Sequence, residues 1–69
     1  MKFEIYRTDT GKRVVQSHEF RDAEAAAGEY SAILMLAGIL PMNENAIQHV
    51  SDEKYCLSNG WTIEVRPVL

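Results

Sequence analysis

Alternating apolar and polar side chains predict a strand at the start of the chain. In residues 2–7, Phe3 and Ile5 alternate with polar neighbours, which is the period of a half-buried strand. Turn-forming residues follow at 9–12, and residues 13–20 return to a β-rich pattern. We therefore expect an N-terminal β-hairpin.

The hydrophobic period becomes helical in the middle of the chain. Asp22 is placed to cap a helix, Glu24 favours the positive end of the helix dipole, and an alanine-rich stretch follows. Pro41 prevents the helix from continuing, and Gly38 is suited to ending it. We expect a helix from about Asp22 to Gly38 or Ile39.

Strand patterns return after a polar loop at residues 42–45. Residues 46–50, 54–58 and 61–68 are β-rich, and Asn59-Gly60 lies between the last two. This dipeptide favours a two-residue type I′ turn, in which both residues take positive φ.

The order of elements predicts an α+β fold. One domain spans residues 1–69, with an antiparallel sheet of four to five strands and one helix packed on one face, in the order β-β-α-β-β-β. Trp61, Ile63 and Val65 alternate in phase in the last strand. We expect the Trp61 ring to lie between sheet and helix, near Tyr30 or Ile33.

The predicted helix is apolar on both sides. Its expected core stripe contains Ala23, Ala26, Ala27, Tyr30, Ile33, Leu34 and Ala37. The opposite side, here called the back face, contains Ala25, Gly28, Ala32, Met35, Leu36 and Ile39. A helix that is apolar all round is usually buried on both sides, so the back face is a candidate interface with a partner or with a second copy of the chain. The alternative is that the C-terminal strands, or the loop around Pro41 and Met42, cover Leu36 and Ile39 within the monomer.

Composition and charge restrict the function classes. The chain has 46% hydrophobic and 25% charged residues, which is typical of a soluble domain. The apolar run at residues 32–40 is too short to span a bilayer, which takes about 20 residues. A lone cysteine, Cys56, and the absence of an apolar signal core at the start indicate a cytoplasmic protein. The net charge of −3 counts against broad binding to phosphate backbones and favours a basic protein partner.

Four acidic residues gather around the start of the predicted helix: Glu19, Asp22, Glu24 and Glu29. They form either a solvated face that complements the helix dipole or a surface for arginine and lysine side chains of a nucleic-acid-binding protein.

The chain contains no recognisable catalytic, metal or nucleotide motif. His18, His49 and Cys56 match no zinc-binding spacing, so we expect no enzyme activity, no metal and no cofactor. The first hairpin carries Arg7, Lys12, Arg13 and Arg21 near Tyr6, which leaves a small DNA-binding accessory protein as the competing function. No continuous basic stripe or paired RNA-binding aromatics support that alternative.

The segments "FEIYRT", "EFRDAEAAAGEY" and "YCLSNGWTIEVRP" follow one another in an order that resembles small phage-encoded accessory proteins, including anti-CRISPR proteins with one helix against an antiparallel sheet. This resemblance implies a stoichiometric inhibitor that binds a nucleoprotein complex and blocks its DNA or RNA site. The segment "DTGKRVVQSHEF" with the helix after it is also similar to the arm-binding domains of phage recombinases, which read DNA with a sheet. We expect a protein-interaction module, either an inhibitor or an adaptor, with direct DNA binding as the alternative.

Overall fold

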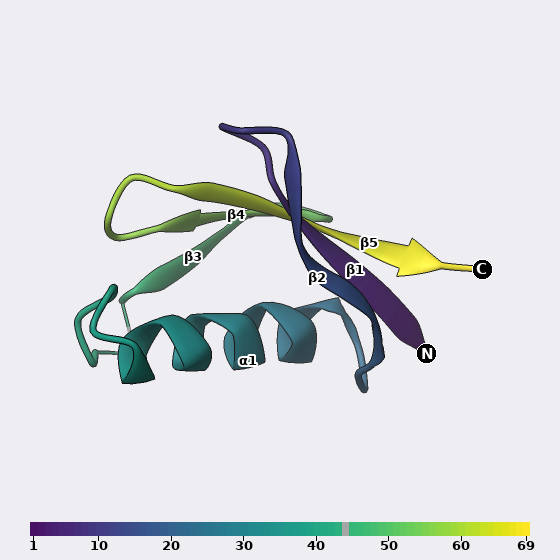
Figure 1. The fold of residues 1–69 in the computed structure, drawn as a ribbon, viewed down its shortest axis with the longest axis horizontal. Helices are drawn as coiled ribbons and strands as arrows, with labels where there is room; N and C mark the ends of the chain where they lie inside the picture. The colour runs from purple at the N-terminus through teal and green to yellow at the C-terminus, as the bar shows by residue number, and fades with distance from the viewer. Residues whose placement is uncertain (44) are drawn as a thin grey trace.

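The computed structural model describes residues 1–43 and 45–69 as two layers, a five-stranded antiparallel sheet and one helix across one of its faces (Figure 1). The elements are β1 (Lys2–Arg7), β2 (Lys12–Glu19), α1 (Ala23–Leu36), β3 (Ile47–Ser51), β4 (Lys54–Leu57) and β5 (Thr62–Val68). The sheet order is β2-β1-β5-β4-β3, with β5 in the centre and β2 and β3 at the edges. The predicted fold class and element order are confirmed, while Glu44 of the predicted loop lies outside the described residues.

The core lies between α1 and the three interior strands, β1, β5 and β4. Ile5, Ile63 and Val65 are fully buried, which confirms the alternation predicted for the first and last strands. On the helix, Ala26 and Ala27 are also buried. Their small side chains allow α1 to lie close to the sheet.

β2 pairs irregularly with β1 at the edge of the sheet. Phe3 is opposite His18 and Ile5 is opposite Val15, so β2 contains one residue more than β1 across this step, and a second shift follows directly. Such bulges break the alternation of side chains. All residues of β2 are described by the structure, and among them only the Val15 side chain is half-buried, while the others are exposed.

Both ends of α1 follow from local chemistry. Asp22 is the N-cap, and its carboxylate accepts a hydrogen bond of 2.8 Å from the Ala25 N–H. At the other end Gly38 has φ 76°, its N–H donates to the Met35 carbonyl, and the Ile39 N–H donates to the Leu34 carbonyl. The helix therefore ends at Leu36, earlier than predicted, because the left-handed glycine turns the chain away.

The turn between β4 and β5 is a hairpin, but it is not type I′. Gly60 has φ 91°, whereas no described residue other than glycine, Asn59 included, has positive φ. Hydrogen bonds from the Gly60 N–H to the Leu57 carbonyl and from the Leu57 N–H to the Trp61 carbonyl close a three-residue loop. The prediction of positive φ at both residues is wrong, because Asn59 instead accepts a hydrogen bond from the Trp61 N–H.

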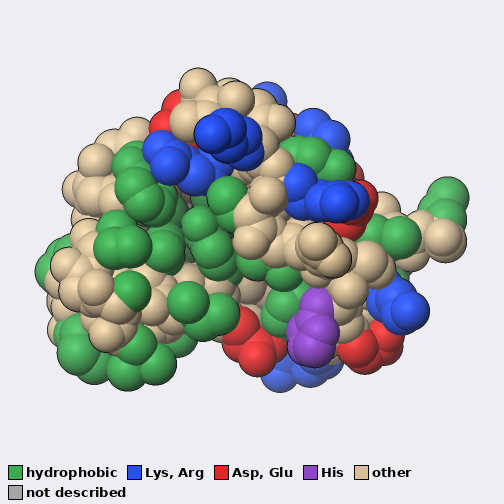
Figure 2. Space-filling model, in the orientation of Figure 1, with side chains coloured by type: hydrophobic (Ala, Val, Ile, Leu, Met, Phe, Trp, Pro, Cys, Tyr) green, Lys and Arg blue, Asp and Glu red, His purple; other side chains and the backbone are tan. Residues whose placement is uncertain are grey.

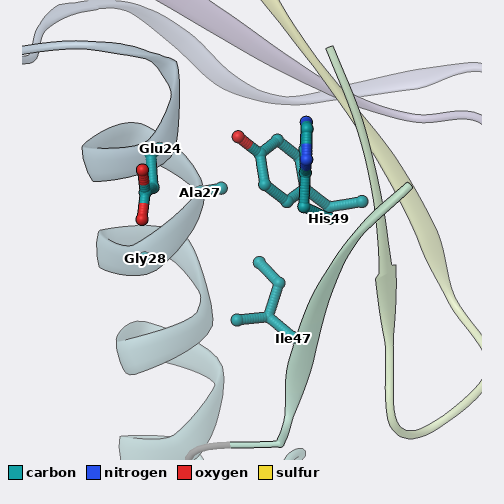
Figure 3. Close-up of a pocket in the computed structure, with 6 residues that line it drawn as sticks. Glu24, Ala27, Gly28, Ile47 and His49 are labelled. Atoms are coloured by element: carbon teal, nitrogen blue, oxygen red, sulfur yellow. The ribbon is translucent and has the colours of Figure 1, made fainter. Parts of the chain in front are cut away.

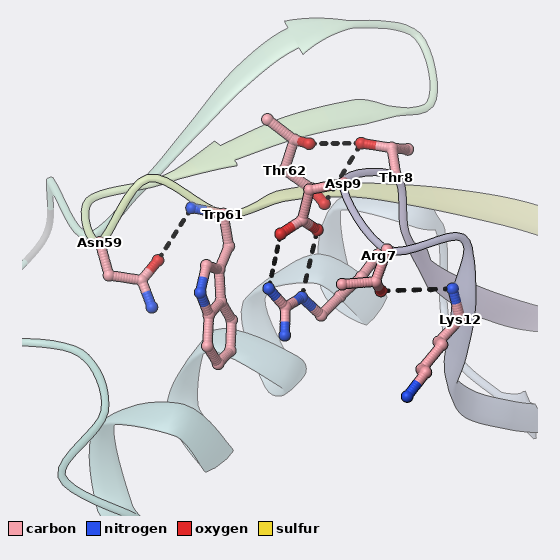
Figure 4. A network of polar contacts seen from close by, with 8 residues as sticks. Arg7, Thr8, Asp9, Lys12, Asn59, Trp61 and Thr62 are labelled. Atoms are coloured by element: carbon pink, nitrogen blue, oxygen red, sulfur yellow. Dashed lines mark hydrogen bonds and ion pairs between the residues drawn. The ribbon is translucent and has the colours of Figure 1, made fainter.

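Trp61 packs against the core but is only half-buried. The guanidinium carbon of Arg7 lies 3.8 Å from the centroid of its ring (Figure 4). The ring is therefore less enclosed than predicted, because Trp61 precedes β5 at the margin of the sheet.

Candidate functional site

The back face of α1 is largely uncovered in this structure. Leu36 is 82% exposed and Ile39 is 44% exposed, and both Gly28 and Ala32 are exposed. Ala25 is half-buried. These residues remain candidates for an interface.

Met35 differs from the rest of the predicted back face. It is half-buried and packs against the core. The connection from α1 to β3 passes near this end of the helix, but it buries its own Leu40 and Ala46. With Leu36 82% and Ile39 44% exposed, neither this loop nor the C-terminal strands bury the two side chains within the monomer, so that alternative is wrong.

The core stripe of α1 also differs from the prediction. Ile33 is 59% exposed and Ala37 is exposed, whereas Ser31 is buried. The Ser31 hydroxyl donates a hydrogen bond of 2.8 Å to the Gly28 carbonyl, which satisfies this buried polar group within the helix. The helix is turned so that Ser31, rather than Ile33, faces the sheet.

Four large apolar side chains gather where α1 ends, and we call them the apolar end: Ile33, Leu36, Ile39 and Met42. They are 59%, 82%, 44% and 77% exposed. Figure 2 shows hydrophobic side chains gathered over this end of the molecule. Single exposed apolar residues are ordinary, but a contiguous patch is typical of an interaction surface.

Sequence reasoning did not place Ile33 and Met42 in this surface. The signal for them was present, because residues 31–43 contain no charged side chain. Whatever the rotation of the helix, one sheet cannot cover all the apolar side chains of such a segment.

A groove lies on each side of α1, because one helix does not cover five strands. The β2 groove has a volume of about 360 Å³, with Val15, Phe20, Tyr30 and Ile33 as apolar lining and His18 and Glu29 among its polar lining. It joins the apolar end at Ile33. Burial raises the pKa of the Tyr30 hydroxyl.

The β3 groove lies on the other side of the helix and has a volume of about 420 Å³. Its lining residues are Glu24, Ala27, Gly28, Ile47, His49 and Tyr55 (Figure 3). The apolar side chains come from both the helix and the sheet, and Glu24 and His49 add the ionisable groups.

Two of the four predicted acidic residues already have partners within the chain. Glu19 pairs with the N-terminal ammonium group of Met1, which lowers the pKa of this carboxyl. The Ala25 N–H lowers the pKa of Asp22, which also pairs with Arg21 at 3.1 Å. Glu24 and Glu29 form no ion pair with any described residue.

The arginines in and beside the first hairpin are also engaged, whereas Lys12 forms no ion pair with any described residue. Each of the four arginines forms an ion pair: Arg7 with Asp9 at 2.5 Å, Arg13 with Glu4 at 2.8 Å, Arg21 with Asp22 and Arg66 with Glu64. The guanidinium carbon of Arg66 lies 4.2 Å from the centroid of the Tyr6 ring, on the sheet face opposite α1. The Tyr6 ring, which belongs to the DNA-binding alternative, is therefore covered on one face.

The residues considered for metal or thiol chemistry are not brought together. His18 lies on β2 and His49 on β3, at opposite edges of the sheet, and Cys56 lies on β4. Each histidine instead packs against an aromatic ring, His18 against Phe20 and His49 against Tyr55, with centroids 5.1 and 5.0 Å apart. Within residues 1–43 and 45–69, no group of three His, Cys, Asp or Glu side chains is arranged to hold a metal ion.

None of the helical structure in the described part of the chain is long and apolar enough to cross a membrane. No protein-family model matches the sequence, and neither the curated proteins nor the solved structures include a match. A functional proposal therefore depends on the surface of this molecule.

Proposed function

We propose that this protein is a non-enzymatic interaction module, an inhibitor or adaptor of the phage accessory type, which binds a basic protein partner through the apolar end and the β2 groove. The observation that carries the proposal is the 82% exposure of Leu36 amid three other exposed large apolar side chains. Full burial of one such side chain stabilises a complex by about 1.5 to 3 kcal/mol. The β2 groove, which continues from Ile33, offers space for an apolar side chain of the partner.

Charge favours a basic partner over a second copy of the chain. α1 contains Glu24 and Glu29 and no lysine or arginine, and the whole chain has a net charge of −3. An isologous contact centred on Gly28 and Ala32 would bring both copies of the exposed Glu29 close to the two-fold axis, where like charges repel. A partner with lysine or arginine beside an apolar side chain complements this surface, and protein subunits of nucleoprotein complexes carry such residues.

Direct binding of DNA through the sheet has less support. All four arginines are in ion pairs with carboxylates of the same chain, and Arg66 covers Tyr6. A phosphate backbone would have to compete with these carboxylates.

Photo-crosslinking tests the proposal and captures the partner in one experiment. Benzoylphenylalanine replaces Leu36 in the cells that naturally produce the protein, and a control chain carries it at Gln48. Gln48 is exposed and pairs with Cys56, so it lies on the sheet face away from α1. We expect an adduct with a lysine- and arginine-containing protein from position 36 and none from position 48.

Three other results would overturn the proposal. An adduct of two copies of this chain would establish a homodimer in place of the basic partner. Crosslinking to nucleic acid would favour the DNA-binding alternative. Equal adducts from positions 36 and 48 would show that the apolar end has no special role.

A further inference from the structure

The β3 groove has a largely apolar lining and one carboxylate, that of Glu24, which has no ion-pair partner among the described residues. Ala27 of α1 and Ile47 of β3 project into it from opposite sides, and Glu24 lies on the helix at its margin (Figure 3). Tyr55, which is opposite His49 in the register of β3 and β4, adds an aromatic ring. The groove is lined for a side chain with an apolar stem and a polar head.

Two carboxylates supply negative charge beside the groove. Burial raises the pKa of the Tyr55 hydroxyl, and the charges of Glu24 and Asp22 raise it further, so both carboxylates act on the groove. Glu24 is exposed and has no ion-pair partner among the described residues. No arginine or lysine lines the groove.

Elsewhere in the molecule, an arginine side chain lies on an aromatic ring and pairs with a nearby carboxylate at two places. Arg7 covers Trp61 while it pairs with Asp9, and Arg66 covers Tyr6 while it pairs with Glu64. His49 and Tyr55 form an aromatic pair with centroids 5.0 Å apart, and Glu24 lines the same groove. Over the part of the chain that the structure describes, no cation lies on either of these rings.

We propose that the β3 groove is the receptor for one arginine side chain of the partner protein. Its methylene stem packs on Ala27 and Ile47, and its planar guanidinium stacks against the His49–Tyr55 pair and donates hydrogen bonds to the Glu24 carboxylate. This inference deepens the proposed function, and it rests on that function only for the claim that the arginine belongs to the partner protein. A lysine would satisfy the charge but would stack less well, because its ammonium group is compact and strongly hydrated.

Titration of the isotope-labelled protein with a blocked arginine, N-acetyl-arginine methylamide, tests the groove by NMR without the partner. The matched probe is the citrulline derivative, which has the same shape without the charge. Two variants accompany the wild type: Glu24→Gln, which removes the groove carboxylate, and Glu53→Gln, which removes one exposed charge from the turn between β3 and β4, outside the lining of either groove. Both variants change the net charge equally.

We expect saturable shifts of the Ala27, Gly28, Ile47 and His49 amides with the arginine probe. Glu24→Gln should weaken this binding about fivefold, the effect of one charge-assisted contact at an exposed site, and Glu53→Gln should not change it. Equal binding of the citrulline probe, equal effects of the two variants, or shifts outside the groove would overturn the inference. Because the probe is a small molecule, these outcomes are independent of photo-crosslinking from position 36.

Discussion

Arg7 and Trp61 lie face to face at the margin of the sheet, with 3.8 Å between the guanidinium carbon and the ring centroid. The same guanidinium pairs with Asp9 at 2.5 Å, and beside it Thr8 hydrogen-bonds to Thr62 (Figure 4). This contact links the turn after β1 to the start of β5. It gives Trp61 a structural role although its ring is only half-buried.

The variant Trp61→Ala should lower the free energy of unfolding by about 2 kcal/mol, less than the roughly 3 to 5 kcal/mol typical of a fully enclosed ring. The loss combines part of the apolar burial with the cation–π contact to Arg7. Urea denaturation followed by circular dichroism measures it, with Val50→Ala as a control at an exposed apolar position. A midpoint equal to that of the wild type would show that the ring is dispensable for the fold.

Three carboxylates should make the fold less stable in acid. Hydrogen bonds and ion pairs lower the pKa of Asp9, Glu19 and Asp22 below their ordinary values of 3.8 and 4.5. Groups whose pKa is lower in the folded protein stabilise it above the unfolded pKa, and this stabilisation is lost as the pH falls through the folded pKa. The urea concentration at the unfolding midpoint should therefore decrease when the pH is lowered beneath about 4.5. Added salt should weaken this effect because all three groups are exposed.

The variant Asp22→Asn distinguishes the helix-capping role of Asp22 from the effect of its negative charge. Asparagine caps a helix as well as aspartate does, so the variant should keep its stability near pH 7 but lose less of it on acidification. Asp22→Ala should be less stable throughout the range above about pH 4.5, because the Ala25 N–H loses its acceptor. Identical acid profiles for the wild type and Asp22→Asn would contradict the assigned role of this carboxylate.

Substitution of two glycines should have opposite effects on stability. Gly28 lies in the helix with no atom within 4 Å of an added Cβ, so Gly28→Ala should stabilise the fold by about 0.5 to 1 kcal/mol. Gly60 has φ 91°, so Gly60→Ala should destabilise it by about 1 to 2 kcal/mol. Thermal unfolding of both variants measures the contrast. Destabilisation by Gly28→Ala would mean that the surroundings of this helix position differ from those in the structure.

The sequence predicted the layers of the fold better than the details of its surface. Alternation around Ile5 and Ile63, and the cap at Asp22, are local signals, and the structure confirms them. The bulges of β2 depend on pairing with β1, which no local pattern records. They explain why the strand buries so little of its apolar surface.

The candidate site was predicted only in part for a related reason. An apolar run such as residues 32–40 has no polar side to fix the rotation of its helix. Ile33 was therefore assigned to the core and Met35 to the surface, while the packing of Ser31 shows a different rotation. The two grooves depend on how much of the sheet one helix covers, which only the assembled fold determines.

Leu36 provides the most direct test of the central claim, that the apolar end binds a partner and is not needed for the fold. The measurement is the yield of partner adduct from benzoylphenylalanine at Ala32, one helical turn away, in chains that carry either Leu36 or Leu36→Glu. A buried unpaired charge should reduce this yield at least about tenfold, while the free energy of unfolding changes by no more than about 0.5 kcal/mol, as at other exposed positions. An undiminished yield, or unfolding of the Leu36→Glu chain, would contradict the account.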